Sequence, residues 1–121
     1  MDDNEFRGVV TKTIGAVVQQ PEMQKLAGSG KVFAFGALDG PVEWHIDATG
    51  TPAFGEGAPE QFNVRARMTK DDWLALFQGR LSPTQAMLRK KLKTEGDVMA
   101  ITGLSMDALV RSYKEQIGGT K

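Results

Sequence analysis

The sequence predicts an α+β fold in which helices pack against one face of an antiparallel sheet. Two segments, residues 42–49 and 62–68, alternate between apolar and polar side chains. Such alternation is typical of strands with one buried and one solvated face, the usual condition in antiparallel sheets. Apolar residues recur at helical spacing before and after these strands. The chain has 121 residues, and we expect a single domain over residues 1–121.

An amphipathic helix is predicted near the start of the chain. Apolar residues recur there at helical spacing up to position 18, and Pro21 then ends or breaks the helix. A short helical continuation over residues 22–27 leads into the turn Gly28-Ser29-Gly30. The apolar positions are Phe6, Val9, Val10, Ile14, Val17 and Val18.

Three strands follow, with a weaker fourth at an edge. Residues 31–38 are apolar on both faces, which indicates a strand that is well covered. The two alternating segments supply the next strands. Pro52 and nearby glycines restrict residues 51–57 to an edge strand. Residues 55–61 are expected to form a mobile loop.

Two short capped helices are predicted after the strands. Thr69 can cap the first helix, and Gly79 ends it. Ser82 can cap the second helix, with Pro83 at its first position and Gln85 completing a capping box. Both helices carry large apolar side chains on one side.

A short strand and a final helical region complete the prediction. Residues 92–95 form the strand, which turns at Gly96-Asp97. Residues 99–110 are spaced to lie over the sheet, and Gly103 and Ser105 can divide this region into two pieces. The order helix, strands, helix pair, strand and helix is that of an α+β domain.

Composition excludes several classes of protein. Fifteen basic and fifteen acidic side chains cancel, so no overall field attracts nucleic acid. The chain has no cysteine, which excludes disulfides and thiolate chemistry. No apolar run approaches the roughly 20 residues of a membrane span, so we expect no stable membrane insertion. The first residues lack a signal-peptide pattern, and we expect a cytoplasmic location.

The sequence contains no recognisable catalytic or metal-binding constellation. The single His45 lies on the polar side of its strand, where the simplest interpretation is a solvated histidine. Asp71 and Asp72 fall in the first turn of a helix, where carboxylates suit the helix dipole. We therefore expect no enzyme, no metal and no cofactor. A hydrolase or isomerase built on His45 is the remaining catalytic alternative.

Methionines and aromatic residues concentrate in the second half of the chain. Met68, Met87, Met99 and Met106 accompany Trp73 and the neighbouring phenylalanine. Methionine fills irregular gaps and lines adaptable pockets. Two interpretations follow, an ordinary hydrophobic core or a plastic chamber for an apolar ligand.

Residues 68–97 resemble the sterol carrier protein-2 (SCP2) family of lipid-binding domains. The resemblance lies in an ordered set of short motifs and extends upstream to WHID at 44–47. The sequence has Lys90 where family members usually have glycine, and Asn63 where many have aspartate. Residues 98–101 replace a smaller, glycine-containing stretch. The matching motifs are MT at 68–69, DWLAL at 72–76, GRLSP at 79–83, AML at 86–88 and KLKTEGD at 91–97.

The resemblance implies a small stand-alone domain of the bacterial type, with a five-stranded antiparallel sheet covered by helices and enclosing an apolar tunnel. It also implies a non-catalytic carrier of a fatty acid, acyl-CoA, sterol or similar lipid. The alternative is an accessory subunit that presents a quinone precursor or catabolic substrate to a partner enzyme. A pathway enzyme and a second copy of the chain, as a homodimer, are both left open as partners.

The candidate binding residues combine this resemblance with the apolar pattern. The basic residues Arg89, Lys90 and Lys91 are candidates for an anionic headgroup, and the competing interpretation is a solvated helix end. The candidate wall residues are Trp44, Ile46, Trp73, Leu76, Phe77, Met87, Leu88, Met99, Leu104 and Leu109.

Overall fold

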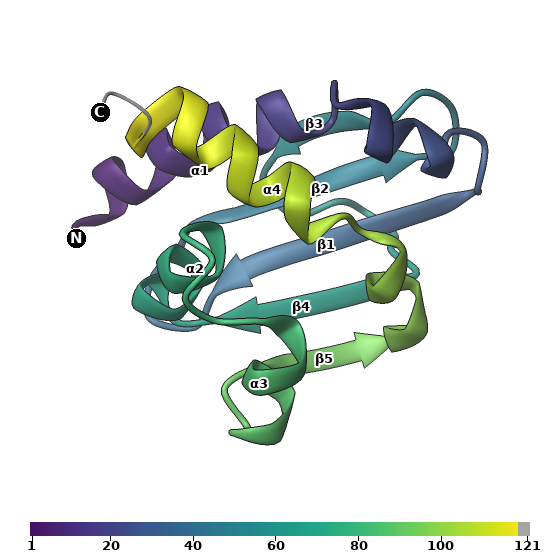
Figure 1. The fold of residues 1–121 in the computed structure, drawn as a ribbon. Coiled ribbons are helices and arrows are strands. Elements are labelled where there is room, and N and C mark those ends of the chain that lie inside the picture. Colours follow the sequence, from purple (N-terminus) through teal and green to yellow (C-terminus); the bar gives the residue numbers. More distant parts are fainter. Residues whose placement is uncertain (119–121) are drawn as a thin grey trace.

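Five strands form one sheet, and helices cover one of its faces (Figure 1). The computed structural model describes residues 1–118, apart from the side chains at positions 98, 102 and 103. No helix in this part of the chain is long and apolar enough to cross a membrane. The α-helices are α1 (Asp3–Val17), α2 (Lys70–Phe77), α3 (Pro83–Leu88) and α4 (Met106–Tyr113).

Shorter helical segments precede the first strand, follow the last strand and extend α4. They are the 3₁₀ segments η1 (Pro21–Leu26) and η2 (Val98–Gly103), and the π-helical segment η3 (Lys114–Gly118). The strands are β1 (Lys31–Ala37), β2 (Glu43–Ala48), β3 (Ala53–Glu56), β4 (Val64–Met68) and β5 (Lys93–Gly96). The α+β class and the predicted strands are confirmed, including the edge position of β3.

The sheet is mixed, so the prediction of a purely antiparallel sheet was wrong. The strand order is β3-β2-β1-β4-β5. β1, β2 and β3 form an antiparallel meander, and β5 is antiparallel to β4. β4, however, runs parallel to β1, with Phe33 opposite Val64 and Ala37 opposite Met68.

The segment between β3 and β4 explains this parallel pair. At its beginning, the Gly57 amide donates to the Glu43 carbonyl oxygen on β2, at 2.9 Å. At its end, the Asn63 amide donates to the Val32 carbonyl oxygen on β1, also at 2.9 Å. The chain therefore passes from the β3 edge to the far side of β1 and enters β4 in the same direction as β1. Alternation reveals one buried and one solvated face, which is common in antiparallel sheets but does not require every neighbouring pair of strands to be antiparallel.

The helix starts follow the predicted caps. Thr69 Oγ1 accepts from the Asp72 amide at 3.2 Å. Ser82 Oγ accepts from the Gln85 amide at 3.1 Å, and the Gln85 side chain accepts from the Ser82 amide at 3.0 Å, which completes a capping box. Ser105 caps α4, so it divides the last helical region as predicted. These local bonds fix where each helix begins and which side chains turn towards the sheet.

Candidate functional site

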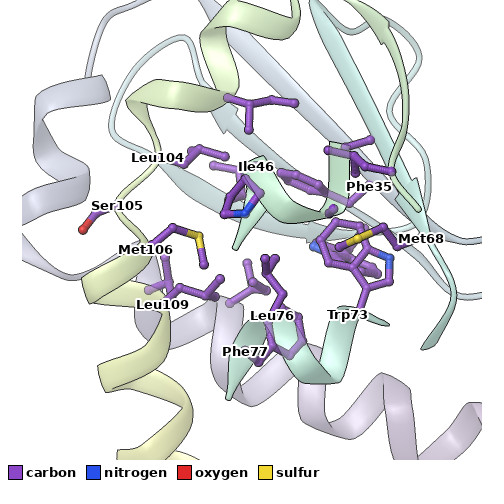
Figure 2. A pocket seen from close by; sticks show the side chains of 18 of the residues that line it. Phe35, Ile46, Met68, Trp73, Leu76, Phe77, Leu104, Ser105, Met106 and Leu109 are labelled. Carbon is purple, nitrogen blue, oxygen red and sulfur yellow. The ribbon is translucent and has the colours of Figure 1, made fainter. Parts of the chain in front are cut away.

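An apolar cavity of about 70 Å³ lies between the sheet and the helices that cover it (Figure 2). Strands β1, β2 and β4 form its floor, and helices form its walls. Its residues are Ile14, Val17, Met23, Phe35, Trp44, Ile46, Ala66, Met68, Trp73, Leu76, Phe77, Pro83, Ala86, Leu92, Ile101, Leu104, Ser105, Met106 and Leu109.

Local periodicity aims these side chains at the cavity. Trp44 and Ile46 are two residues apart on β2, so both lie on the helix-covered face of the sheet. On α2, Trp73 is followed by Leu76 and Phe77 at helical spacing, so the three share a side. Figure 2 shows Met106 and Leu109 from α4 facing these α2 residues across the cavity.

Seven of the ten candidate wall residues line the cavity, and three do not. Met87, Leu88 and Met99 are 50%, 78% and 70% exposed, and none is among the lining residues. In α3 the buried position is Ala86, which is 0% exposed. Met87 and Leu88 follow it by about 100° and 200° around the helix axis, so they turn outwards. The seven lining residues are Trp44, Ile46, Trp73, Leu76, Phe77, Leu104 and Leu109.

Sequence reasoning missed several wall residues that strand register would have indicated. Phe35 lies opposite Trp44 in the β1–β2 pair, so the two side chains share a face. Ala66 and Met68 alternate onto the same face of β4. The contributions of Ile14 and Val17 from α1 depend on tertiary packing, for which the sequence carries no local signal. The further missed residues are Met23, Pro83, Ala86, Leu92, Ile101, Ser105 and Met106.

The candidate headgroup residues lie at the end of α3, outside the cavity lining. Lys91 Nζ forms an ion pair with Asp72 Oδ1 at 3.2 Å. Arg89 and Lys90 are exposed, and neither forms an ion pair within the described part of the chain. The structure therefore brings Lys91 to a carboxylate on α2 and leaves the other two cations in solvent.

Lys90 takes a left-handed backbone conformation, with φ 58°. Its amide donates to the Met87 carbonyl oxygen, and the Lys91 amide donates to the Ala86 carbonyl oxygen. This pair of bonds is the Schellman motif that ends many helices and favours glycine at the left-handed position. Glycine would take this conformation without strain, whereas lysine here is strained.

His45 lies on the opposite face of the sheet from the cavity. Its Nδ1 is 2.9 Å from the Gly57 carbonyl oxygen, which can only accept, so the proton sits on Nδ1. This hydrogen bond joins β2 to the segment that leads to β4. The imidazole is half-buried, whereas the sequence predicted a solvated histidine. Among the residues that the structure describes, no group of three or more His, Cys, Asp or Glu could hold a metal ion.

Ion pairs join the helices that surround the cavity, α2 to α1 and α4 to η1. Lys70 Nζ lies 2.8 Å from Asp3 Oδ1, and this hydrogen bond raises the pKa of Lys70. The hydrogen bond from Arg111 lowers the pKa of Glu22, joining α4 to η1. These charges lie at the edges of the helices, while the cavity itself is lined almost wholly by hydrocarbon.

The comparisons with known proteins agree with this arrangement. Residues 12–107 match the SCP-2 sterol transfer family. The chain is 26% identical over 84 residues to "Non-specific lipid-transfer protein-like 1" of Caenorhabditis elegans, a match that covers 68% of this chain and 71% of that protein.

Solved structures show the same fold. The palmitated SCP2L2 of Aedes aegypti superposes with a TM-score of 0.67 at 19% identity, covering 84% of this chain and 91% of that one. The structure described as "UbiJ-SCP2 Ubiquinone synthesis protein" gives a TM-score of 0.60 at 9% identity, covering 93% and 95%. With most of its length matched by the family, the chain is a member of the SCP-2 sterol transfer family.

Proposed function

We propose that this chain binds and carries a hydrophobic ligand without catalysing a reaction on it. The observation that carries the proposal is the cavity between sheet and helices, whose lining is almost wholly apolar. Family membership supports it, as does the name of the nematode relative, "Non-specific lipid-transfer protein-like 1". Binding would come mainly from removing apolar surface from water, at roughly 25 cal/mol per Å² before ordering costs.

The cavity must widen to hold a lipid. Its volume of about 70 Å³ is smaller than the roughly 150 Å³ of an engineered cavity that binds benzene. Drug-sized ligands occupy roughly 300–1,000 Å³. Met23, Met68 and Met106 lie in the lining, and unbranched methionine side chains change rotamer easily. We infer that a ligand displaces these side chains and separates the helices from the sheet.

We propose three classes of ligand, namely fatty acids, acyl-CoA thioesters and sterols. The Aedes aegypti neighbour is described as palmitated, which supports an acyl chain. Ala86 lines the cavity, and Arg89 and Lys90 follow it by about one helical turn. These two cations would therefore meet the carboxylate or phosphate of a ligand whose chain lies in the cavity. Lys91 is a weaker candidate, since Asp72 already engages it.

A saturable titration with a fluorescent fatty acid, together with native mass spectrometry of the purified protein, tests this function. Ala66→Val adds two methyl groups to the cavity floor, where Ala66 is 3% exposed. We expect fatty-acid affinity to fall about tenfold or more, because the valine occupies space that the ligand needs.

The matched control is Ala53→Val, the same change on the exposed side of β3. We expect this variant to bind like the wild type, because Ala53 does not line the cavity. A protein that carries no co-purified lipid and shows no saturable binding would contradict the proposed function. Equal affinities for the two variants would place the ligand elsewhere in the molecule.

A second function, presentation of a lipophilic intermediate to a partner enzyme, is favoured by the surface of α3. Met87 and Leu88 expose apolar side chains there, next to the exposed cations Arg89 and Lys90. A partner with an apolar patch rimmed by carboxylates would match this surface. The neighbour described as a ubiquinone synthesis protein is compatible with such a role.

Pull-down from the native lysate separates the two functions. An accessory subunit should retain a specific enzyme, and Leu88→Asp should release that enzyme while fatty-acid binding persists. Leu88 is 78% exposed, so the fold should tolerate the change. Recovery of no enzyme would favour the free carrier.

A further inference from the structure

One residue of the cavity lining carries a buried polar side-chain atom that has no hydrogen-bond partner in the described part of the chain. Three lining residues carry a side-chain nitrogen or oxygen, namely Trp44, Trp73 and Ser105. Trp73 Nε1–H donates to the Gly36 carbonyl oxygen at 2.8 Å. Ser105 Oγ accepts from the Ala108 amide at 3.1 Å and is turned away from the cavity (Figure 2). Trp44 Nε1–H, in contrast, is buried without an acceptor in the described part of the chain.

The surroundings of Trp44 are aromatic. The side chain is 1% exposed. Its ring stacks on Phe35 with centroids 5.7 Å apart and meets Phe6 and Trp73 edge-on at 5.9 Å and 5.0 Å. An aromatic face is a weak acceptor for an N–H group. Buried tryptophan N–H groups usually have a partner, so an exception beside a ligand cavity calls for an explanation.

We propose that Trp44 Nε1–H donates a hydrogen bond to an oxygen of the bound ligand. This inference rests on the proposed function and adds a preference to it: apolar molecules that carry a neutral carbonyl, such as a ketone, an ester or a quinone-type ring, would bind more tightly than apolar molecules of the same size without that oxygen. A carboxylate is disfavoured at this depth because no cationic side chain lines the described part of the cavity. Trp73 Nε1–H already donates to Gly36, and Ser105 Oγ is turned away from the cavity, so Trp44 would select the position of that oxygen.

Water is the competing partner for this indole. Trp44 also borders a second hollow of about 150 Å³, which it shares with Arg7, Glu43 and Glu56. A hydrogen bond to water there would be present without ligand and would not change when a ligand enters the apolar cavity. The two partners therefore differ in their response to ligand.

Proton–nitrogen correlation spectra of the wild-type protein distinguish them. The chain has two tryptophans, so two indole signals are expected, and Trp73 serves as the internal reference. The probes are 2-undecanone and undecane, which differ in one carbonyl oxygen. We expect the ketone to move the Trp44 Nε1–H signal downfield while Trp73 moves little. Undecane should perturb the methyl signals of Leu76 and Leu109 in proton–carbon correlation spectra. It should not move the Trp44 Nε1–H signal downfield.

Affinities provide the second measurement. The preference for the ketone over the alkane should be about tenfold smaller in Trp44→Phe than in the wild type. Phe35→Leu is the control, since it removes a ring from the same wall without removing a donor, and it should keep the preference. The wild-type spectra still decide the question if Trp44→Phe does not fold.

The outcomes separate this inference from the proposed function. A Trp44 signal that the ketone leaves unmoved, or an unchanged preference in Trp44→Phe, overturns the hydrogen bond while ligand binding stands. If neither probe perturbs any lining residue, the proposed function fails and the hydrogen bond fails with it.

Discussion

At the scale of single residues, the most informative position is the left-handed residue that ends each short helix. Gly79 ends α2 with φ 80°, and Lys90 ends α3 with φ 58°. Both make the Schellman pair of hydrogen bonds. Glycine adopts this conformation without strain, whereas an L side chain at such a φ costs roughly 1–2 kcal/mol. The same turn is therefore relaxed at Gly79 and strained at Lys90.

Replacing Lys90 with glycine should stabilise the protein. Relief of the left-handed strain outweighs the extra chain entropy of glycine in the unfolded state, so we expect a gain of about 1 kcal/mol. Chemical denaturation measures the free energy of unfolding. The control is Arg89→Gly, one residue earlier at φ −89°, which should destabilise slightly. A Lys90→Gly variant no more stable than the wild type would mean that Lys90 carries a compensating interaction.

At the scale of elements, the segment before β4 decides the topology. Asn63 fastens this segment to the strands on either side of β4. Its amide donates to the Val32 carbonyl oxygen, its side-chain Oδ1 accepts from the Val32 amide at 2.8 Å, and its carbonyl oxygen accepts from the Asp97 amide at 2.8 Å. Asn63 thus extends the parallel β1–β4 pair by one side-chain bond.

Asn63→Ala should destabilise the protein by about 1 kcal/mol, because the Val32 amide loses its side-chain acceptor. Asn63→Asp retains an acceptor at the same place and should be nearly neutral. Urea denaturation of the three proteins gives the comparison. If Asn63→Ala and Asn63→Asp lower the free energy of unfolding equally, the side-chain bond to Val32 does not contribute to stability.

The attachment of α4 to η1 should depend on pH. The hydrogen bond from Arg111 lowers the pKa of Glu22 below its ordinary value of 4.5. A lowered carboxyl pKa gives stability that is fully present above the unfolded value and is lost as pH falls through the folded value. The Tm difference between the wild type and Glu22→Gln should therefore be fully present above the unfolded-state pKa of Glu22 and should disappear as the pH falls through its lowered folded-state pKa. A difference that persists in acid would rule out this linkage.

At the scale of the whole molecule, the cavity depends on elements from both ends of the chain. α1 supplies Ile14 and Val17, and α4 supplies Met106 and Leu109. The Gln20 side chain donates to Ser112 Oγ at 3.2 Å, which joins the segment after α1 to α4. A ligand that fills the cavity would therefore contact segments that are separated by most of the sequence.

Ligand binding should raise the stability of the whole domain. A ligand that binds only the folded state stabilises it by about 2.7 kcal/mol at a concentration of 100 Kd. We expect Tm to rise with fatty-acid concentration in the wild type and in Ala53→Val, and to rise much less in Ala66→Val. Differential scanning calorimetry measures this. An equal rise in all three proteins would indicate binding outside the cavity.

The sequence by itself determined the elements and the family. Caps at Thr69, Ser82 and Ser105 bond within three residues, so their positions are readable locally. Alternation likewise identified the buried faces of β2 and β4, since it depends only on the two-residue period of a strand.

Only the tertiary structure decided the parallel β1–β4 pair, the membership of the cavity wall and the burial of the Trp44 indole without an acceptor among the described residues. Met87 and Leu88 are as apolar as Leu76, yet they face solvent because Ala86 is the side of α3 that packs inwards. The physical reason is that hydrophobicity predicts that a side chain should be buried, whereas the packing of distant segments determines which side chains are.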